Sequence, residues 1–233
     1  MPNVAPAELE KFNKLAQEWW DPTGPMKPLH QLNPLRLQFI TQHCALLNKN
    51  VLDVGCGAGI LSETMAQAGA RVTGLDAAID VLAAARAHQE QHKLSNPVNY
   101  YLGTLEEFST QQPPLFDVIT CMELLEHVPN PSQLIQNCVR LLKPEGLIFF
   151  STINRNLKSF LFAIVGAEYV ARMLPIGTHH YAQFIRPSEL NQWAEKAGLH
   201  LLALTGMNYQ LLKDQFILSE HVAVNYLVCY QKS

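Results

Sequence analysis

The segment 120–131, TCMELLEHVPNP, carries two glutamates and a histidine whose spacing suits joint chemistry. Glu123, Glu126 and His127 are spaced i, i+3 and i+4, so one helical turn would place all three side chains on the same face. Such a set can bind a divalent cation, or it can be a general base with orienting carboxylates, or a solvated helix start. Choosing among these interpretations requires the elements that surround the three side chains.

Short apolar strands alternate with helices through the middle of the chain, which is typical of a parallel sheet covered on both faces. Before them, the sequence predicts a helical cap over 1–49, with one helix over 8–20 and a second over about 34–47. An insertion over 154–186 interrupts the alternation. We expect one α/β domain over 1–233 with a doubly wound, Rossmann-like sheet of seven strands, mostly parallel with the last strand antiparallel. The predicted strands are 50–55, 70–76, 96–103, 114–122, 145–153, 199–209 and 221–233.

The composition of the 233-residue chain excludes several classes of protein. It is 48% hydrophobic and 16% charged, which indicates a globular protein, and its net charge of −3 without any Lys/Arg run gives no sign of nucleic-acid binding. The five cysteines form no CxxC motif and are odd in number, so we expect reduced thiols in the cytoplasm. The N-terminus lacks the apolar region of a secretory signal, and no run of about 20 apolar residues is present to span a bilayer.

The first predicted strand runs into a glycine-rich turn, VGCGAG, that is typical of a nucleotide site. Gly55, Gly57 and Gly59 let the backbone turn tightly and approach a ligand without a Cβ in the way. The second strand ends in Asp76, twenty-one residues after Gly55, where a carboxylate can accept both hydroxyls of a ribose. Ile60 stands where a dinucleotide fingerprint has its third glycine, which disfavours the alternative of an NAD-linked oxidoreductase.

Longer segments carry a more specific signal than this turn. VLDVGCGAG resembles motif I of class I S-adenosylmethionine-dependent methyltransferases, with Asp76 as the ribose acid. From about residue 8 to the C-terminus the chain also resembles the ubiquinone-biosynthesis O-methyltransferase family, in segments such as FNKLAQEWWDPTGPMKPLHQLNPLRL, TCMELLEHVPNP, FFSTINRN and GTHHYAQFIRPSEL. The departures are small: Ala58 stands where bacterial relatives often have glycine, and GTHHYAQF lies in a variable region.

The resemblance implies a cosubstrate, an acceptor and a protein complex. The cosubstrate would be S-adenosylmethionine and the acceptor a polyprenylated phenol or quinol, methylated once as a catechol-type precursor and once as the demethylubiquinol. A ubiquinone-biosynthesis complex would be a further partner. The alternatives are an O-methyltransferase for another small phenol, or a catalytically silent cofactor-binding partner in a biosynthetic complex.

The resemblance also implies cofactor contacts at Arg36, Gly55, Asp76 and Met122, and Gly57 in the same turn joins them. We expect Arg36 in the first turn of the second cap helix, where a guanidinium can pair with the methionyl carboxylate, although most arginines lie on the surface. Met122 follows the fourth strand at the carboxyl edge, where ligands bind in open α/β sheets.

Methyl transfer to a phenol requires removal of its proton or stabilisation of the phenolate, because the pKa of such a group is about 10. His127 can act as the general base, since its unperturbed pKa lies nearest neutrality. The resemblance implies instead a divalent metal (Mg, Mn or Zn) held by Glu123, Glu126 and His127. The residues alone leave both interpretations open, beside a third in which His127 packs on the cofactor.

The segment 156–177 is apolar at helical spacing, with Lys158 and Arg172 flanking. A helix packed on the core, a lid over a prenyl tail, or a peripheral membrane contact all fit this pattern. The segment is too short to span a bilayer.

Overall fold

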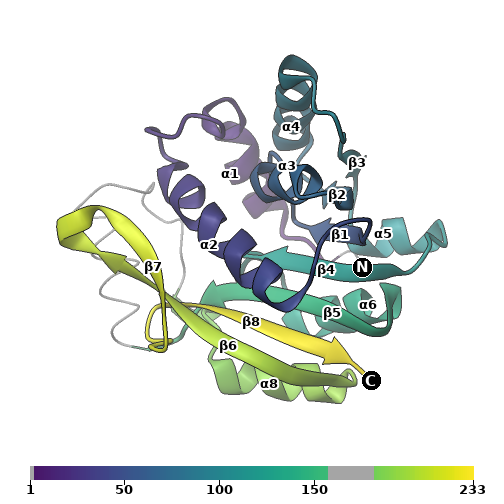
Figure 1. Ribbon diagram of the computed structural model, residues 1–233, viewed down its shortest axis with the longest axis vertical. Helices are drawn as coiled ribbons and strands as arrows, with labels where there is room; N and C mark the ends of the chain where they lie inside the picture. The colour runs from purple at the N-terminus through teal and green to yellow at the C-terminus, as the bar shows by residue number, and fades with distance from the viewer. Residues whose placement is uncertain (1–2, 157–180) are drawn as a thin grey trace.

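An eight-stranded sheet forms the centre of the computed structural model, which describes residues 3–156 and 181–233 (Figure 1). The strands are β1 (Asn50–Val54), β2 (Arg71–Asp76), β3 (Asn99–Leu102), β4 (Phe116–Met122), β5 (Leu142–Ile153), β6 (Leu199–Gln210), β7 (Gln215–Ser219) and β8 (Asn225–Lys232). They are hydrogen-bonded in the order β3-β2-β1-β4-β5-β8-β6-β7. β1 to β5 pair in parallel, β8 is antiparallel to β5 and β6, and β7 is antiparallel to β6.

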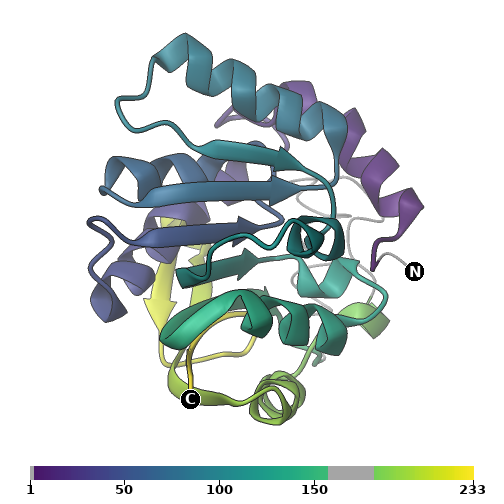
Figure 2. The ribbon, with the colours of Figure 1, turned by 90° about the vertical axis from the view of Figure 1, so that its right-hand side faces the viewer.

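Two hydrophobic cores fill the two faces of the sheet, because consecutive strand residues point to opposite sides. Val51 and Phe149 belong to one core, whereas their neighbours Leu52 and Phe150 belong to the other. The first core is covered by α2 (Lys27–His43), α3 (Ile60–Gln67) and α4 (Ile79–His92). The second is covered by α5 (Leu105–Thr110), α6 (Pro131–Leu141) and α8 (Pro187–Lys196), so the sheet is doubly wound as predicted (Figure 2).

The strand order reverses at β1, which lies between β2 and β4. In open α/β sheets, ligands bind outside the carboxyl ends of the strands at such a reversal. The turns after β1 and β4 are therefore the expected walls of a site, and they contain the glycine turn and the TCMELLEH segment.

The seven predicted strands are present, and β7 is an eighth that the sequence did not reveal. The link from β6 to β7 is the 3-10 turn η5 (Leu211–Lys213) followed by Asp214, whose φ of +47° lies in the left-handed region. Hairpin turns usually use glycine or asparagine for that conformation, so the sequence contained no strong turn signal.

The cap helices differ from their predicted bounds. The helix expected over 8–20 is shorter, α1 (Pro6–Lys14), and is followed by the 3-10 turn η1 (Ala16–Glu18). The second helix, α2, begins at Lys27 rather than at Pro34, because Pro28 suits its first turn and Pro34 is tolerated on the exposed side of its interior.

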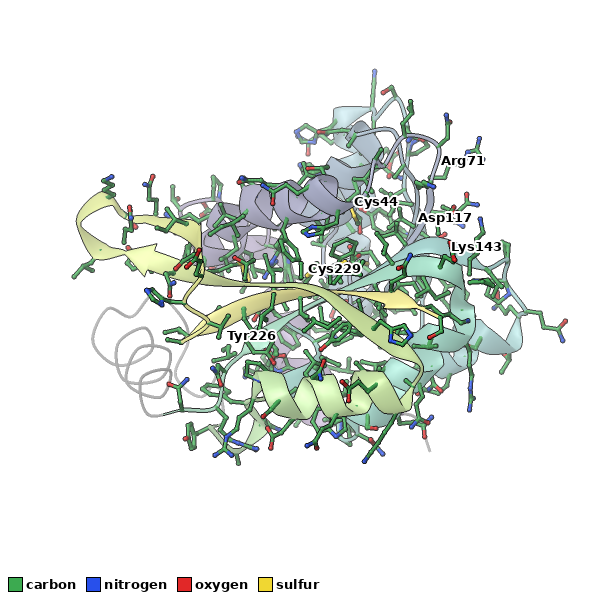
Figure 3. The ribbon with its side chains drawn as sticks, turned by 60° about the horizontal axis from the view of Figure 1, so that its bottom comes forward. Cys44, Arg71, Asp117, Lys143, Tyr226 and Cys229 are labelled. Atoms are coloured by element: carbon green, nitrogen blue, oxygen red, sulfur yellow. The ribbon has the colours of Figure 1, made fainter. Side chains whose placement is uncertain are left out.

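Side-chain hydrogen bonds at both ends of the parallel strands hold the sheet together. Asp117 on β4 accepts hydrogen bonds from Nζ of Lys143 at 2.8 Å and from the backbone N–H of Asn50 at 2.9 Å (Figure 3). Near the carboxyl end of β5, where Tyr226 of β8 pairs with Thr152, the hydroxyl of Tyr226 donates to the carbonyl of Ile185, just before α8, at 3.0 Å. Within the described residues, no helix is long and apolar enough to cross a membrane.

Candidate active site

The glycine turn after β1 brings bare backbone up to a cavity. Gly55 and Gly57 have φ of +71° and +56°, a region that other residues rarely adopt. A Cβ on Gly57 would lie 2.7 Å from Cζ2 of Trp19, and one on Gly55 would lie 2.8 Å from Cδ2 of Leu124. Both positions therefore require glycine for conformation and for space.

Asp76 ends β2 and faces this turn. Its Oδ2 accepts a hydrogen bond from the N–H of Gly57 and its Oδ1 accepts one from the N–H of Ala78, both at 2.8 Å. Burial raises the pKa of the carboxyl, and the backbone hydrogen bonds oppose that rise. Each carboxylate oxygen has two lone-pair positions, so each keeps one for a ribose hydroxyl.

Asp53 was not predicted as a site residue, yet it organises the same turn. It is buried and accepts hydrogen bonds from Oγ of Ser62 at 2.6 Å and from Oγ1 of Thr120 at 2.7 Å. Because Ser62 lies on α3 and Thr120 on β4, Asp53 joins the three elements around the turn. The signal that could have revealed it is an acidic residue inside the apolar strand VLDV.

Arg36 lies in the middle of α2 rather than in the first turn of a helix, as the sequence had suggested. Its side chain is buried, and Nη2 lies 3.4 Å from Oε1 of Glu123. Among the described residues, Nε and Nη2 have no hydrogen-bond partner. Buried N–H groups without partners are costly, so this guanidinium fits an anionic group of a ligand, such as the methionyl carboxylate of the predicted cofactor.

The end of β4 presents Met122 and Glu123 to the cavity. Met122 is buried, and Glu123 has a φ of +50°, which is uncommon for a residue other than glycine. The N–H of Glu123 donates to the carbonyl of Ser151 at 3.0 Å, and Oγ of Ser151 donates to Oε1 of Glu123 at 2.7 Å. Ser151 on β5 therefore fixes both the backbone and the carboxylate of Glu123.

His127 belongs to the 3-10 turn η2 (Leu125–His127), not to a turn of α-helix. Its Nδ1 lies 2.7 Å from Oε2 of Glu8 on α1, and its ring meets the ring of Phe12 edge-on at 5.1 Å between centroids. Burial lowers the pKa of His127, but the hydrogen bond to Glu8 and the charges of Glu126 and Glu8 together outweigh burial and raise the pKa above its usual value. With Nδ1 engaged by a carboxylate, Nε2 is the nitrogen left for a ligand in the cavity that His127 lines.

Glu8 is a second residue that sequence reasoning missed. Glu8, Phe12 and Leu15 are spaced i, i+4 and i+7, so the acid lies on the same face as two apolar residues of the predicted helix. That placement is a usable signal, because an acid on a buried face usually has a specific partner.

Glu126 is almost completely buried, at 3% exposure. Its Oε2 accepts a hydrogen bond from Oγ1 of Thr152 at 2.8 Å, and its Oε1 has no hydrogen-bond partner in the described part of the chain. Burial, and then the nearby charge of Glu123, raise the pKa of Glu126 to about 8. The carboxyl is therefore mostly protonated near neutral pH and can donate a hydrogen bond.

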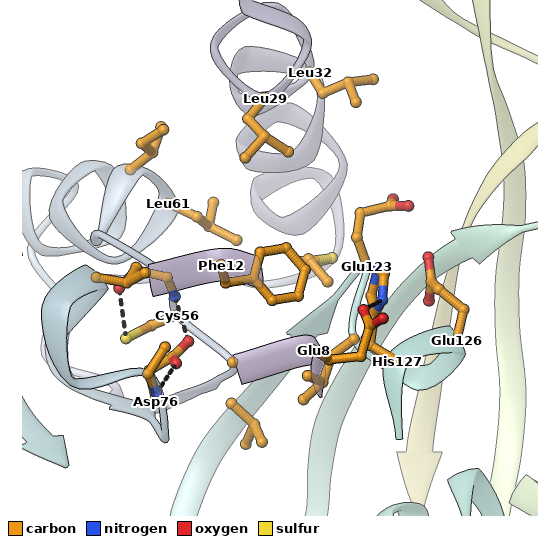
Figure 4. Close-up of a pocket in the computed structure, with 18 of the residues that line it drawn as sticks. Glu8, Phe12, Leu29, Leu32, Cys56, Leu61, Asp76, Glu123, Glu126 and His127 are labelled. Carbon is orange, nitrogen blue, oxygen red and sulfur yellow. Dashed lines mark hydrogen bonds and ion pairs between the residues drawn. The ribbon is translucent and has the colours of Figure 1, made fainter. Parts of the chain in front are cut away.

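The three predicted metal ligands do not converge on one point (Figure 4). Glu123, Glu126 and His127 are each hydrogen-bonded to a different partner, and a neutral Glu126 is a poor ligand because metal ligands must be deprotonated. Over residues 3–156 and 181–233, no group of three or more His, Cys, Asp or Glu side chains is placed to hold a metal ion. These residues, as arranged, do not fit the predicted three-ligand site.

One cavity of about 870 Å³ connects the groups described above. Gly57, Asp76, Arg36, Glu126 and His127 all line it, and Figure 4 shows Asp76 on one side and Glu126 with His127 on the other. Most of the remaining lining is apolar. The groups that suit a nucleoside with a carboxylate and the groups that suit proton transfer therefore open onto the same space.

Comparison with known proteins agrees with this geometry. A family model described as a methyltransferase domain matches residues 11–204. The structure of magnesium protoporphyrin IX methyltransferase from Synechocystis PCC 6803 with bound SAH is similar, with a TM-score of 0.65 at 19% identity over 88% of this chain and 83% of that one. The fold and the matching family model define a class I S-adenosylmethionine-dependent methyltransferase.

Two full-length relatives define the group more narrowly. The ubiquinone biosynthesis O-methyltransferase of Coxiella burnetii (strain RSA 331 / Henzerling II) is 56% identical over 98% of this chain and 96% of its own length. The protein of the same name from Burkholderia thailandensis is 50% identical over the whole of both chains. The chain belongs to the family of ubiquinone biosynthesis O-methyltransferases.

Proposed function

We propose that this protein transfers the methyl group of S-adenosylmethionine to phenolic hydroxyls of polyprenylated aromatic rings, at both O-methylation steps of ubiquinone biosynthesis. The observation that carries the proposal is the shared cavity, in which the Asp76 and Arg36 groups and the His127 group face one space. The names of the relatives support the substrate class.

Arg36, Asp76 and the glycine turn hold the cofactor in this proposal. Arg36 pairs with the methionyl carboxylate, and Asp76 accepts hydrogen bonds from the ribose hydroxyls. Gly55 and Gly57 allow the backbone to approach, while Met122 packs against the cofactor from the end of β4. S-adenosylmethionine supplies a sulfonium whose methyl group is open to attack.

His127 is the general base. Nε2 takes the proton of the acceptor phenol as the phenolic oxygen forms its bond to the methyl carbon, and the carbon–sulfur electron pair leaves with the sulfur. Glu8 accepts a hydrogen bond from Nδ1–H, which fixes the tautomer in which Nε2 is free and stabilises the imidazolium that forms. Positioning of the two substrates in line supplies much of the remaining rate.

Glu126 orients the acceptor. Its protonated carboxyl donates a hydrogen bond from the oxygen that lacks a protein partner to an oxygen next to the reacting hydroxyl on the ring. Such a contact favours rings with two adjacent oxygens, because a buried polar group left unpaired by the wrong substrate costs binding energy.

The test uses purified protein, methyl-labelled S-adenosylmethionine and two short-tailed acceptors, one a catechol and one a demethylubiquinol analogue. We expect label in a methoxy group of both products, located by mass spectrometry. Label in only one product would restrict the proposal to that step, and label in a carbon- or nitrogen-linked methyl group would refute it.

The remaining proposals rest on the sequence. We propose that the protein is cytoplasmic and works beside other enzymes of the pathway. We also propose that its segment 156–177 closes over the substrate or rests on the membrane. After Asn156 this segment lies outside the described residues. For the membrane contact, wild-type protein should sediment with anionic liposomes and a Phe160→Asp/Ile164→Asp variant should not. Wild-type protein that does not sediment with liposomes would refute the membrane contact and leave the lid standing.

A further inference from the structure

The cavity extends beyond the groups used so far, toward the β6–β7 hairpin. The apolar side chains that line this extension, here named the hairpin groove, come from the start of α2 and from the hairpin. They are Met26, Leu29, Leu32, Met207, Leu211 and Phe216. Figure 1 shows the hairpin reaching past the other strands beside the start of α2.

The sheet register connects the hairpin groove to the end of β5, beside the residue that binds the buried acid Glu126. Thr152, which binds Glu126, is followed on β5 by Ile153, which is paired with Asn225 of β8. Asn225 is in turn paired with Met207 of β6. Two strand spacings of about 4.8 Å separate Ile153 from Met207, so the groove begins roughly 10 Å from the carboxyl end of β5.

A polar cluster around Asp214 ties the hairpin to α2. Oδ2 of Asp214 lies 2.6 Å from Nζ of Lys27, and Oδ1 accepts a hydrogen bond from the hydroxyl of Tyr209 at 2.6 Å. The backbone carbonyl of Asp214 accepts a further hydrogen bond from Nε2 of Gln31 at 2.8 Å. The contacts from Lys27 and Gln31 hold the tip of the hairpin against the first turns of α2, and the contact from Tyr209 lies within the hairpin. Apolar side chains line the groove itself.

The side chains at the mouth of the groove are unusually apolar for their exposure. Leu211 is 81% exposed, although it lines the cavity. Leu29 and Phe216 are only partly buried, and the ring of Phe216 packs against Tyr209 at 5.0 Å between centroids. The groove leads from Glu126 and His127 to the exposed Leu211. An apolar groove of this kind suits a long hydrocarbon chain attached to a polar ring.

We propose that the hairpin groove is the binding subsite for the prenyl tail of the acceptor, and that Asp214 keeps its wall in place by joining the hairpin to α2. The inference rests on the proposed function, because it places the aromatic ring at His127. The tail then leaves the ring along β5, β8 and β6 and passes between Leu29 and Phe216 to the rim at Leu211.

The experiment compares two acceptors that share the same catechol ring, one without a tail and one with a tail of two isoprene units. Leu211→Asn removes apolar surface at the rim, and Asp214→Asn removes the charge while keeping a residue that tolerates a positive φ. Leu47→Asn is the matched control, because Leu47 is also strongly exposed, at 69%, but does not line the cavity. Calorimetry with S-adenosylmethionine verifies that each variant is folded and binds the cofactor.

We expect wild-type protein to prefer the tailed acceptor in kcat/KM. Leu211→Asn and Asp214→Asn should each lower kcat/KM for the tailed acceptor about tenfold, by raising KM while kcat stays constant. The value of kcat/KM for the tailless acceptor should not change. Leu47→Asn should change neither. A wild type without any tail preference, or variants that affect both acceptors equally or neither, would overturn the inference while leaving the proposed function standing. A wild type that methylates neither acceptor would overturn the proposed function itself.

Discussion

Replacing Glu8 by glutamine isolates the charge that we assign to the orientation of His127. The amide of the new side chain would retain a hydrogen-bond acceptor of the same shape for Nδ1–H, so Glu8→Gln loses the negative charge and little else. The side chains of Glu8 and His127 are only 16% and 10% exposed, so water screens their interaction weakly. Changes in the protonation of His127 should therefore report the loss of that charge directly.

The expected shift in the pKa of His127 follows from the strengths of charged and neutral hydrogen bonds. Hydrogen bonds to charged groups contribute about 1.5–3 kcal/mol and neutral ones about 0.5–1.5 kcal/mol. Replacing the carboxylate of Glu8 by an amide should therefore weaken the hydrogen bond to the protonated His127 by roughly 1–1.5 kcal/mol. One pKa unit corresponds to about 1.4 kcal/mol. The Glu8 hydrogen bond raises the pKa of His127 whereas burial lowers it, so Glu8→Gln should lower the pKa by about one unit.

The assay is kcat/KM for a short-tailed catechol as a function of pH, at saturating cofactor and constant ionic strength, since this ratio reports the ionisation of the free enzyme. The acid limb should lie above pH 6.5 in the wild type and move about one unit lower in Glu8→Gln. Glu10→Gln is the control, because Glu10 lies on the same helix and pairs with Lys14 on the exposed surface. Coincident acid limbs for Glu8→Gln and wild type, or an equal shift in the control, would refute the assigned role.

Two further predictions concern the cofactor and the buried acid. Asp76→Ala and Arg36→Met should each weaken S-adenosylmethionine binding about tenfold or more by calorimetry. Only Asp76→Ala should weaken the binding of 5′-methylthioadenosine, which has the ribose but no carboxylate. If only Arg36→Met weakened it, Arg36 would contact the ribose and Asp76 would not, which contradicts the assignment. Glu126 has a pKa of about 8 in the folded protein and about 4.3 unfolded, so its contribution to stability falls as pH rises through that window. The melting temperature of Glu126→Gln relative to wild type should accordingly rise by roughly 10 °C between pH 5 and pH 8.5, and a constant difference would argue against a buried neutral acid.

The sequence contained most of the central sheet because its signals are local. Apolar runs such as NVLDV and FDVITCM are buried on both faces, and the glycine turn between β1 and α3 needs glycine at Gly55 and Gly57 for the positive φ of the turn itself. The distance from Gly55 to Asp76 is fixed by one strand–helix–strand unit. Local patterns of this kind need no knowledge of remote contacts.

Other features depended on long-range contacts or unusual backbone. Glu8 meets His127 across 119 residues, so only the docking of α1 on the sheet reveals the pair. The spacing of Glu123, Glu126 and His127 suggested one helical face, but Glu123 has a positive φ and the following turn is 3-10, which directs the side chains to separate partners. Helical spacing predicts a shared face only where the backbone is helical.

Turnover in the presence of a chelator separates the proposed base mechanism from a metal-dependent one. The assay follows transfer of labelled methyl from S-adenosylmethionine to the short-tailed catechol, with protein dialysed against EDTA and assayed with EDTA present. Because His127 and Glu8 supply the base and Glu126 the orienting hydrogen bond, we predict an unchanged rate with EDTA and no stimulation by Mg, Mn or Zn. Activity lost in EDTA and restored by one of these ions, with weaker metal binding in Glu123→Gln and Glu126→Gln, would contradict this mechanism and establish the metal site instead.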